Sequence, residues 1–369
     1  MNKNILKGVV SLVLVTTVVL VFVSCSKPKE TSPIKIGVMT PLTGDAAIYG
    51  ESLKKGMDLA VEKANVEGVL GRKIELIYED THLDSKVAVS AFNKFVNIDN
   101  LDLVVVAEGS GATSAVVPLA DKTKTLVIIP IASADSLKTV GDYVFRVIPS
   151  DNYRGEKMGK YAKDLGFNKV AVLYVNDDYG IGIKNIFSDS FKKEGGQVFI
   201  AETFNSGGVD YRSQLTKIKE TNPDAIVIAA RKEFPVIMKQ KNELGIKARV
   251  LASEVIDSSI IESAGSDMDG VLALDFAPAT DFVGFKETFK KKYNTEAPLY
   301  SDYGYDSIGI LIEAIEKTKT TDSTKIKNAL YDIEYKGATG LISFNSLGEV
   351  MEKTLIPLIV KDGKFVESK

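Results

Sequence analysis

Short apolar runs alternate along this chain with segments whose apolar residues recur three and four positions apart. The continuous runs predict strands covered on both faces, and the spaced segments predict amphipathic helices. In the first part of the chain the predicted strands are 34–40, 72–80, 101–109 and 125–131, with predicted helices at 49–65, 84–97 and 111–123. Alternating strands and helices predict a parallel sheet with helices on both faces.

A second series of the same kind follows residue 156. Its predicted strands are 168–177, 196–204, 224–230 and 248–254, with predicted helices at 180–195, 211–222 and 234–245. Two further helices are expected at 281–294 and 305–319, and the ending within 337–365 predicts a β-hairpin with a glycine turn. The predicted fold class is therefore α/β, with two open, doubly wound and mostly parallel sheets.

The N-terminus has the order of a signal peptide. Lys3 and Lys7 precede an uncharged, mostly apolar run at 9–24, which ends just before the only cysteine, Cys25. This run is short for a membrane-spanning helix, although a permanent N-terminal anchor stays open as an alternative. We expect 1–24 to be a signal peptide and 25–33 a polar tether.

Composition adds two exclusions. The 369 residues are 45% hydrophobic and 26% charged, which is ordinary for a globular protein with about two domains. The 46 basic and 49 acidic residues are interspersed, which argues against a nucleic-acid partner. With Cys25 as the only cysteine, the folded body has neither disulfides nor thiol chemistry to offer.

One strand-to-helix turn has the composition of an anion site. Residues 108–113 read Glu-Gly-Ser-Gly-Ala-Thr, so small residues and hydroxyls stand where a helix leaves its first N–H groups unpaired. The alternative is that Ser110 only caps its own helix. The turn alone does not decide between the two.

Other predicted strands also end in polar or aromatic residues. In open α/β sheets ligands bind beyond the carboxyl ends of the strands, so two facing sheets would bring these residues together in a cleft. They are Tyr49, Ser133, Tyr179, Arg231 and Glu254.

The chain lacks the residues that several common kinds of functional site require. The chain has neither the Gly-x-Gly-x-x-Gly of dinucleotide sites after its first strand nor a Gly-x4-Gly-Lys-Ser/Thr loop, so no cofactor is expected. His82 is the only histidine, and it lies between Asp80 and Asp84. A metal site there is possible, but three ligands so close in one loop are unusual, and we expect solvated or capping roles and no metal.

Seven segments together resemble a known family. They are 34–52, 108–121, 128–137, 144–151, 170–182, 224–230 and 337–350, and in this order they resemble the extracellular solute-binding proteins of bacterial ABC importers, of the type I fold and the branched-chain amino acid group. The resemblance covers roughly 35–365. In addition, the four residues 22–25 resemble a bacterial lipobox with Phe22 in place of the usual leucine, which implies that Cys25 carries lipid.

The resemblance implies a set of ligand-binding residues. The solute's carboxylate would be held by Ser110, the neighbouring amides including that of Gly111, and the hydroxyl of Ser133. Its ammonium group would go to the Ile131 carbonyl and the Glu254 carboxylate. Tyr49 and Tyr179 would cover the solute from opposite lobes, and Tyr300 would line the side-chain pocket.

One position departs from the family pattern. Where leucine-binding members have a tyrosine after the strand at 224–230, this chain has Arg231. A guanidinium in the cleft would bind a second carboxylate and shift the preference from aliphatic to acidic solutes. Alternatively, Arg231 pairs with Glu254 or Glu233 and adds no selectivity.

The resemblance also implies a domain organisation. Two Rossmann-like lobes would be joined by three crossings near Ser150, Phe276 and Gly340. Lobe one would comprise 34–150 plus 277–339, and lobe two 151–276 plus 340–369.

The implied function is capture of a small solute, most simply an amino acid, by hinge closure and its delivery to an ABC permease. The protein would be exported and held by the lipid on Cys25, either at the outer face of the cytoplasmic membrane or in the periplasm. A ligand-sensing receptor of the same fold, an enzyme and a purely structural lipoprotein are the alternatives. An enzyme would need a base or nucleophile with a shifted pKa, and apart from Glu254 no candidate stands out.

Overall fold

The computed structural model describes residues 31–44, 46–139, 141–254, 261–262, 264–277, 279–351 and 353–368. The predicted signal peptide and Cys25 lie outside the described residues. Within the described residues no helix is long and apolar enough to cross a membrane.

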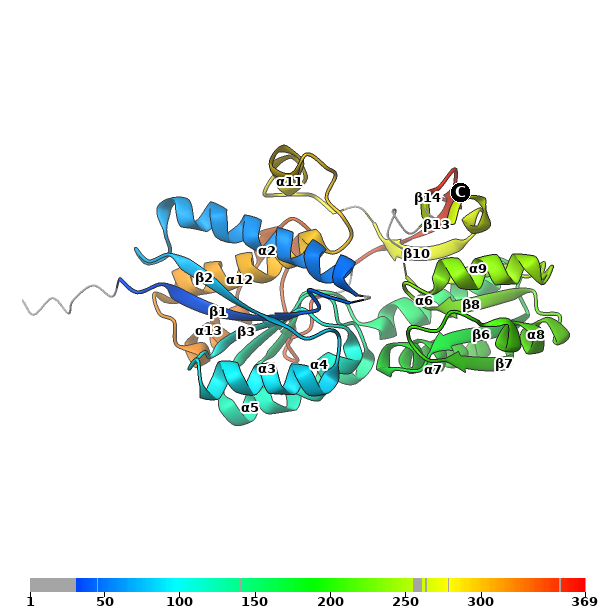
Figure 1. Ribbon diagram of the computed structural model, residues 1–369, viewed down its shortest axis with the longest axis horizontal. Coiled ribbons are helices and arrows are strands. Elements are labelled where there is room, and N and C mark those ends of the chain that lie inside the picture. Colours follow the sequence, from blue (N-terminus) through cyan, green and yellow to red (C-terminus); the bar gives the residue numbers. More distant parts are fainter. Residues whose placement is uncertain are drawn as a thin grey trace, which may run out of the picture. The chain divides into compact units, whose positions relative to one another are not determined.

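The first sheet is parallel throughout and has the strand order β2-β1-β3-β4-β5. Its strands are β1 (Ile34–Thr40), β2 (Ile74–Asp80), β3 (Leu103–Val106), β4 (Leu126–Ile129) and β5 (Val144–Arg146). One face packs against α2 (Ala47–Glu67), α12 (Ser301–Thr318) and α13 (Ser323–Leu330), and the other against α3 (Ser85–Asn97) and α4 (Ser110–Val116) (Figure 1). Buried apolar residues on both faces explain why these strands read as continuous apolar runs.

The second sheet has the order β14-β13-β10-β9-β8-β6-β7. Its parallel strands are β6 (Lys169–Val175), β7 (Gln197–Phe204), β8 (Ala225–Ala229), β9 (Arg249–Ala252) and β10 (Leu272–Phe276). Its helices are α6 (Asp151–Asp164), α7 (Asp178–Lys193), α8 (Arg212–Glu220) and α9 (Phe234–Glu243). The last strands, β13 (Leu355–Lys361) and β14 (Lys364–Glu367), join it antiparallel. The predicted α/β class with two sheets is confirmed, as is the final hairpin, which turns at Gly363 (φ 72°).

Several elements differ from the prediction. β5, β10 and α13 were not predicted. β5 has only three residues, α13 has only eight, and the charged Asp275 interrupts the apolar run of β10. The single helix expected at 111–123 is instead α4, a 3-10 turn (Val117–Leu119) and α5 (Ala120–Thr123). Pro118 in the 3-10 turn explains the break, because its ring nitrogen cannot donate a helical hydrogen bond. The predicted helix at 281–294 begins later, as α11 (Phe285–Tyr293).

The third crossing lies further along the chain than Gly340. Residues 340–350 were expected in lobe two, but Ile342, Phe344 and Val350 are buried in the core beneath α2 and α12. The short hairpin of β11 (Tyr335–Gly337) and β12 (Gly340–Ile342) therefore packs with lobe one, and the chain enters the second sheet only at β13. The remaining lobe boundaries stay predictions.

Candidate functional site

The two sheets reverse strand order at equivalent places. In the first the switch lies between β1 and β3, and in the second between β6 and β8. The residues just beyond these four strand ends, including Pro41, Ala107, Asp177 and Arg231, line one cavity of about 410 Å³, called here the first cavity. A ligand site at the switch points is what this topology favours.

Seven of the nine predicted ligand-binding residues line the first cavity. They are Tyr49, Ser110, Gly111, Ile131, Arg231, Glu254 and Tyr300. The other two, Ser133 and Tyr179, are buried and do not line it. Residues from both sheets thus meet at the place where the strand ends had indicated a cleft.

Ser110 does not cap its own helix. The N-cap of α4 is Gly109, and no side chain makes a capping hydrogen bond there. Instead the Ser110 Oγ accepts a hydrogen bond from the Ala134 backbone N–H at 3.2 Å. The capping interpretation of Ser110 is therefore wrong, and the hydroxyl ties the turn to the segment that follows β4.

Ser133 points away from the first cavity. Its Oγ donates to Asp151 Oδ2 at 2.9 Å, and its carbonyl accepts the Asp151 N–H at 2.8 Å. Burial raises the pKa of Asp151 to about 6, although the positive charge of Arg154 opposes the shift. Ser133 thus fixes the start of α6 at the first crossing between the lobes.

Arg231 is held between an aromatic ring and two carboxylates. Its guanidinium carbon lies 3.9 Å from the ring centroid of Tyr179, whose hydroxyl is 2.6 Å from Ser253 Oγ. Its Nε is 3.5 Å from Glu254 Oε1, and its Nη1 is 3.6 Å from Asp177 Oδ2. The ion pair with Glu254 is confirmed, and Asp177 was not foreseen.

Glu233 does not pair with Arg231. Its Oε1 accepts hydrogen bonds from the Ser206 hydroxyl and the Gly207 N–H, so it fastens the loop after β7. The side chain of Arg231 remains 25% exposed and lines the first cavity.

Tyr300 connects the two lobes across the site. It has φ 70° and ψ −6°, a left-handed conformation that bulky residues rarely adopt. Its hydroxyl donates to Glu254 Oε2 at 3.2 Å, and its ring centroid lies 6.0 Å from that of Tyr49. An unusual backbone conformation thus places an aromatic ring and a hydroxyl beside the Glu254 carboxylate.

The loop around His82 follows the expectation of capping. Asp84 caps α3 by accepting hydrogen bonds from the N–H groups of Lys86 and Val87. Asp80 accepts from the Leu42 N–H and the Thr43 hydroxyl, and His82 Nδ1 lies 2.6 Å from the same hydroxyl. Across the described ranges, no group of three or more potential ligands is arranged to hold a metal ion.

Glu108 precedes the Ser110 turn and was not predicted to matter. It is fully buried, Thr81 donates to its Oε1, and its Oε2 has no hydrogen-bond partner among the residues that the structure describes. Burial, with a smaller repulsion from Asp80, raises the pKa of Glu108 to about 8 despite the hydrogen bond from Thr81. A buried acid of this kind favours the protonated form.

This pKa predicts a pH dependence of stability. Since the pKa of Glu108 is higher in the folded state than in the unfolded chain, the folded protein binds more protons between about pH 4.5 and 8. Stability should therefore fall as the pH rises through this window. The variant Glu108→Gln should raise the melting temperature at pH 8.5 by several degrees and flatten its change between pH 6 and 8.5. The same dependence of melting temperature on pH in the parent and the variant would contradict this prediction. The control is Glu202→Gln, which removes one partner of the ion pair with Lys217.

Comparisons with known proteins agree with this architecture. The sequence profile of a family described as "Periplasmic binding protein" matches residues 33–363. A leucine-, isoleucine-, valine-, threonine- and alanine-binding protein of Pseudomonas aeruginosa is 28% identical over 337 residues, which is 89% of this chain and 90% of that protein.

Solved structures show the same relationship. A leucine-binding protein, LivK, of Thermotoga maritima superposes with a TM-score of 0.84 at 29% identity, covering 91% of this chain and 98% of that one. LivJ of Streptococcus pneumoniae, solved with isoleucine, superposes with a TM-score of 0.80 at 28% identity. The match covers 90% of this chain and 97% of LivJ. These relatives are named as binding proteins, in agreement with the prediction that the chain is not an enzyme.

Proposed function

The chain belongs to the periplasmic binding protein family, and we propose that it captures a zwitterionic amino acid in the first cavity. Three relatives that match along nearly the whole chain are named for, or were solved with, branched-chain amino acids. The solute is thus an amino acid that enters between the two lobes.

The observation that carries this proposal is that hydrogen-bond donors lie on one side of the first cavity and a carboxylate on the other. On the side of the first sheet the cavity offers the Ser110 hydroxyl and the backbone of the turn around Gly111, and on the side of the second sheet the carboxylate of Glu254. A solute carboxylate on the first side would accept hydrogen bonds from these donors, and an ammonium group on the second would give Glu254 a closer partner than Arg231, whose Nε lies 3.5 Å away.

Ser133 and Tyr179 take indirect roles in this proposal. Ser133 holds Asp151 at the start of α6, and Tyr179 supports the guanidinium of Arg231 from beneath. Neither needs to touch the solute, which differs from the direct contacts that the family resemblance implied.

The charge balance around Arg231 favours a solute of zero net charge. Arg231 already has two carboxylate neighbours, Glu254 and Asp177, at 3.5 and 3.6 Å. When the solute's ammonium group joins Glu254, Asp177 continues to neutralise Arg231. An acidic side chain would add a third carboxylate, so the preference for acidic solutes is not what this arrangement supports.

Around this site we place the rest of the implied function. Hinge closure between the lobes buries the solute, and contacts made only in the closed form stabilise it. The exported protein is anchored by lipid on Cys25 and passes the solute to an ABC permease.

The test is a thermal-shift panel of the full-length chain in detergent. Each amino acid is compared with its amide, which lacks the carboxylate, and with the matching carboxylic acid, which lacks the ammonium group. At a hundredfold excess over Kd an amino acid should stabilise the folded state by about 2.7 kcal/mol, which raises the melting temperature by several degrees. No shift with any amino acid, or an equal shift with a simple carboxylic acid, would count against the proposal.

A further inference from the structure

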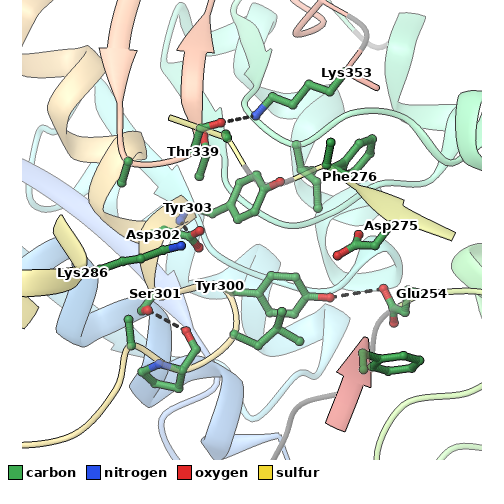
Figure 2. A pocket seen from close by; sticks show the side chains of 18 of the residues that line it. Glu254, Asp275, Phe276, Lys286, Tyr300, Ser301, Asp302, Tyr303, Thr339 and Lys353 are labelled. Carbon is green, nitrogen blue, oxygen red and sulfur yellow. Dashed lines mark hydrogen bonds between the residues drawn. The ribbon is translucent and has the colours of Figure 1, made fainter. Parts of the chain in front are cut away.

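A second cavity adjoins the first. It has a volume of about 470 Å³ and is lined from lobe one, from the crossings and from the second sheet (Figure 2). Glu254 and Tyr300 are the residues that line both cavities. These two side chains, joined by the 3.2 Å hydrogen bond from Tyr300 to Glu254, therefore lie at the boundary between the two spaces.

Hydrogen-bond donors in this second cavity are largely unused. Arg154 is only 7% exposed, and its guanidinium carbon lies 4.9 Å from the ring centroid of Phe276. Its Nη2 forms an ion pair with Asp275 Oδ1 at 3.5 Å. Within the described residues its guanidinium makes no hydrogen bond of normal length, and neither does the Tyr303 hydroxyl. Lys353 donates one of its three N–H groups to the Thr339 carbonyl, with Nζ and the oxygen 2.8 Å apart.

Acceptors stand among these donors. The carboxylates of Asp275 and Asp302 lie on opposite sides of the Tyr303 ring, and Glu254 lies beyond Asp275 (Figure 2). Partly buried charges of both signs thus face the same space. An aliphatic side chain entering there would remove water from these groups and return no hydrogen bond, which is costly.

The charges also argue against a strongly charged occupant. Glu254, Asp275 and Asp302 are matched by Arg154 and Lys353, with two exposed lysines, Lys286 and Lys364, at the walls. Neither sign has a clear surplus. A neutral group that both donates and accepts hydrogen bonds fits such a wall best, and the carboxamide is the simplest of these.

From this geometry we infer that the second cavity is a subsite for the distal end of the solute, and that it selects amino acids with a neutral hydrogen-bonding side chain over aliphatic ones. The inference rests on the proposed function, because the amino acid head must occupy the first cavity. Once its ammonium group engages Glu254, the Tyr300 hydroxyl loses part of its hold on that carboxylate. The ring can then turn aside and admit the side chain.

The test pairs matched solutes with a minimal variant. Calorimetric titration of the full-length chain in detergent uses glutamine, methionine as its apolar counterpart of similar length, glutamate as its charged isostere, and leucine. Glutamine should bind at least tenfold more tightly than methionine or glutamate. Tyr303→Phe should weaken the binding of glutamine roughly 5- to 20-fold and change the binding of leucine less than twofold.

Tyr174→Phe is the control, because Tyr174 is also half-buried, lies in lobe two and lines neither cavity. Its affinities should equal those of the parent. If leucine or methionine binds as tightly as glutamine, or Tyr303→Phe weakens all solutes alike, the subsite is overturned while the proposed function stands. If no amino acid binds at all, the proposed function itself has failed.

Discussion

Glu254→Gln should weaken binding of the captured amino acid about a hundredfold. Glu254 lines both cavities, its side chain is 13% exposed, and its two oxygens face Arg231 and Tyr300. The amide preserves the shape of the side chain but removes the charge that pairs with the solute's ammonium group. Removing one partner of a desolvated charge pair costs roughly 2 to 5 kcal/mol, so a hundredfold loss lies within the expected range.

Titration calorimetry with the solute that the thermal-shift panel identifies measures this loss. In the free protein Arg231 keeps its contact with Asp177, so the melting temperature without solute should change by only a few degrees. Glu202→Gln, at a surface pair with Lys217, should leave the affinity unaltered. A change of less than threefold in the Glu254 variant would mean that another group receives the ammonium.

The sequence made the sheets and the strand-end residues predictable for a physical reason. Parallel strands are buried on both faces, so β1, β3, β4, β6 and β8 stand out as apolar runs. The residue after such a strand lies at the carboxyl edge of the sheet, however the helices pack against it. Arg231 and the Ser110 turn could therefore be placed at a cleft before their neighbours were known.

What could not be predicted depends on contacts between distant parts of the chain. Tyr300 and Glu254 are 46 positions apart, and nothing near either residue in the sequence indicates that the Tyr300 hydroxyl donates to Glu254. The same holds for Asp177 beside Arg231, and for the Ser110 hydroxyl, which meets Ala134 rather than its own helix. β5 was missed because three residues carry no measurable period, and β10 because Asp275 interrupts its apolar run.

The placement of Tyr300 depends on how closely two helices approach. A Cβ atom built on Gly56 in α2 would lie 1.8 Å from the backbone carbonyl oxygen of Ser301, the first residue of α12, and one on Gly304 would lie 2.4 Å from the carbonyl oxygen of Leu53. These glycines let the two helix backbones touch. Because Ser301 directly follows Tyr300, the contact between α2 and α12 also sets the position of the Tyr300 ring.

Gly56→Ala should therefore destabilise the protein and weaken solute binding together. In an ordinary helix interior, glycine to alanine stabilises by roughly 0.5 to 1 kcal/mol. At Gly56 a backbone atom occupies the space, so the helices must separate, and we expect a loss of about 3 kcal/mol or more and a melting temperature lower by 5 to 10 °C or so. Affinity should fall several-fold, because the Tyr300 ring lines the first cavity beside Tyr49 and moves with α12.

The matched control is Gly182→Ala on α7, where a Cβ meets no atom within 4 Å. This variant should be as stable as the parent or slightly more so, with unchanged affinity. Thermal melts and titrations of both variants separate the two effects. A Gly56 variant that gains stability as the Gly182 variant does would show that the helices can part without cost. One that loses stability but keeps full affinity would show that the position of Tyr300 does not depend on the contact.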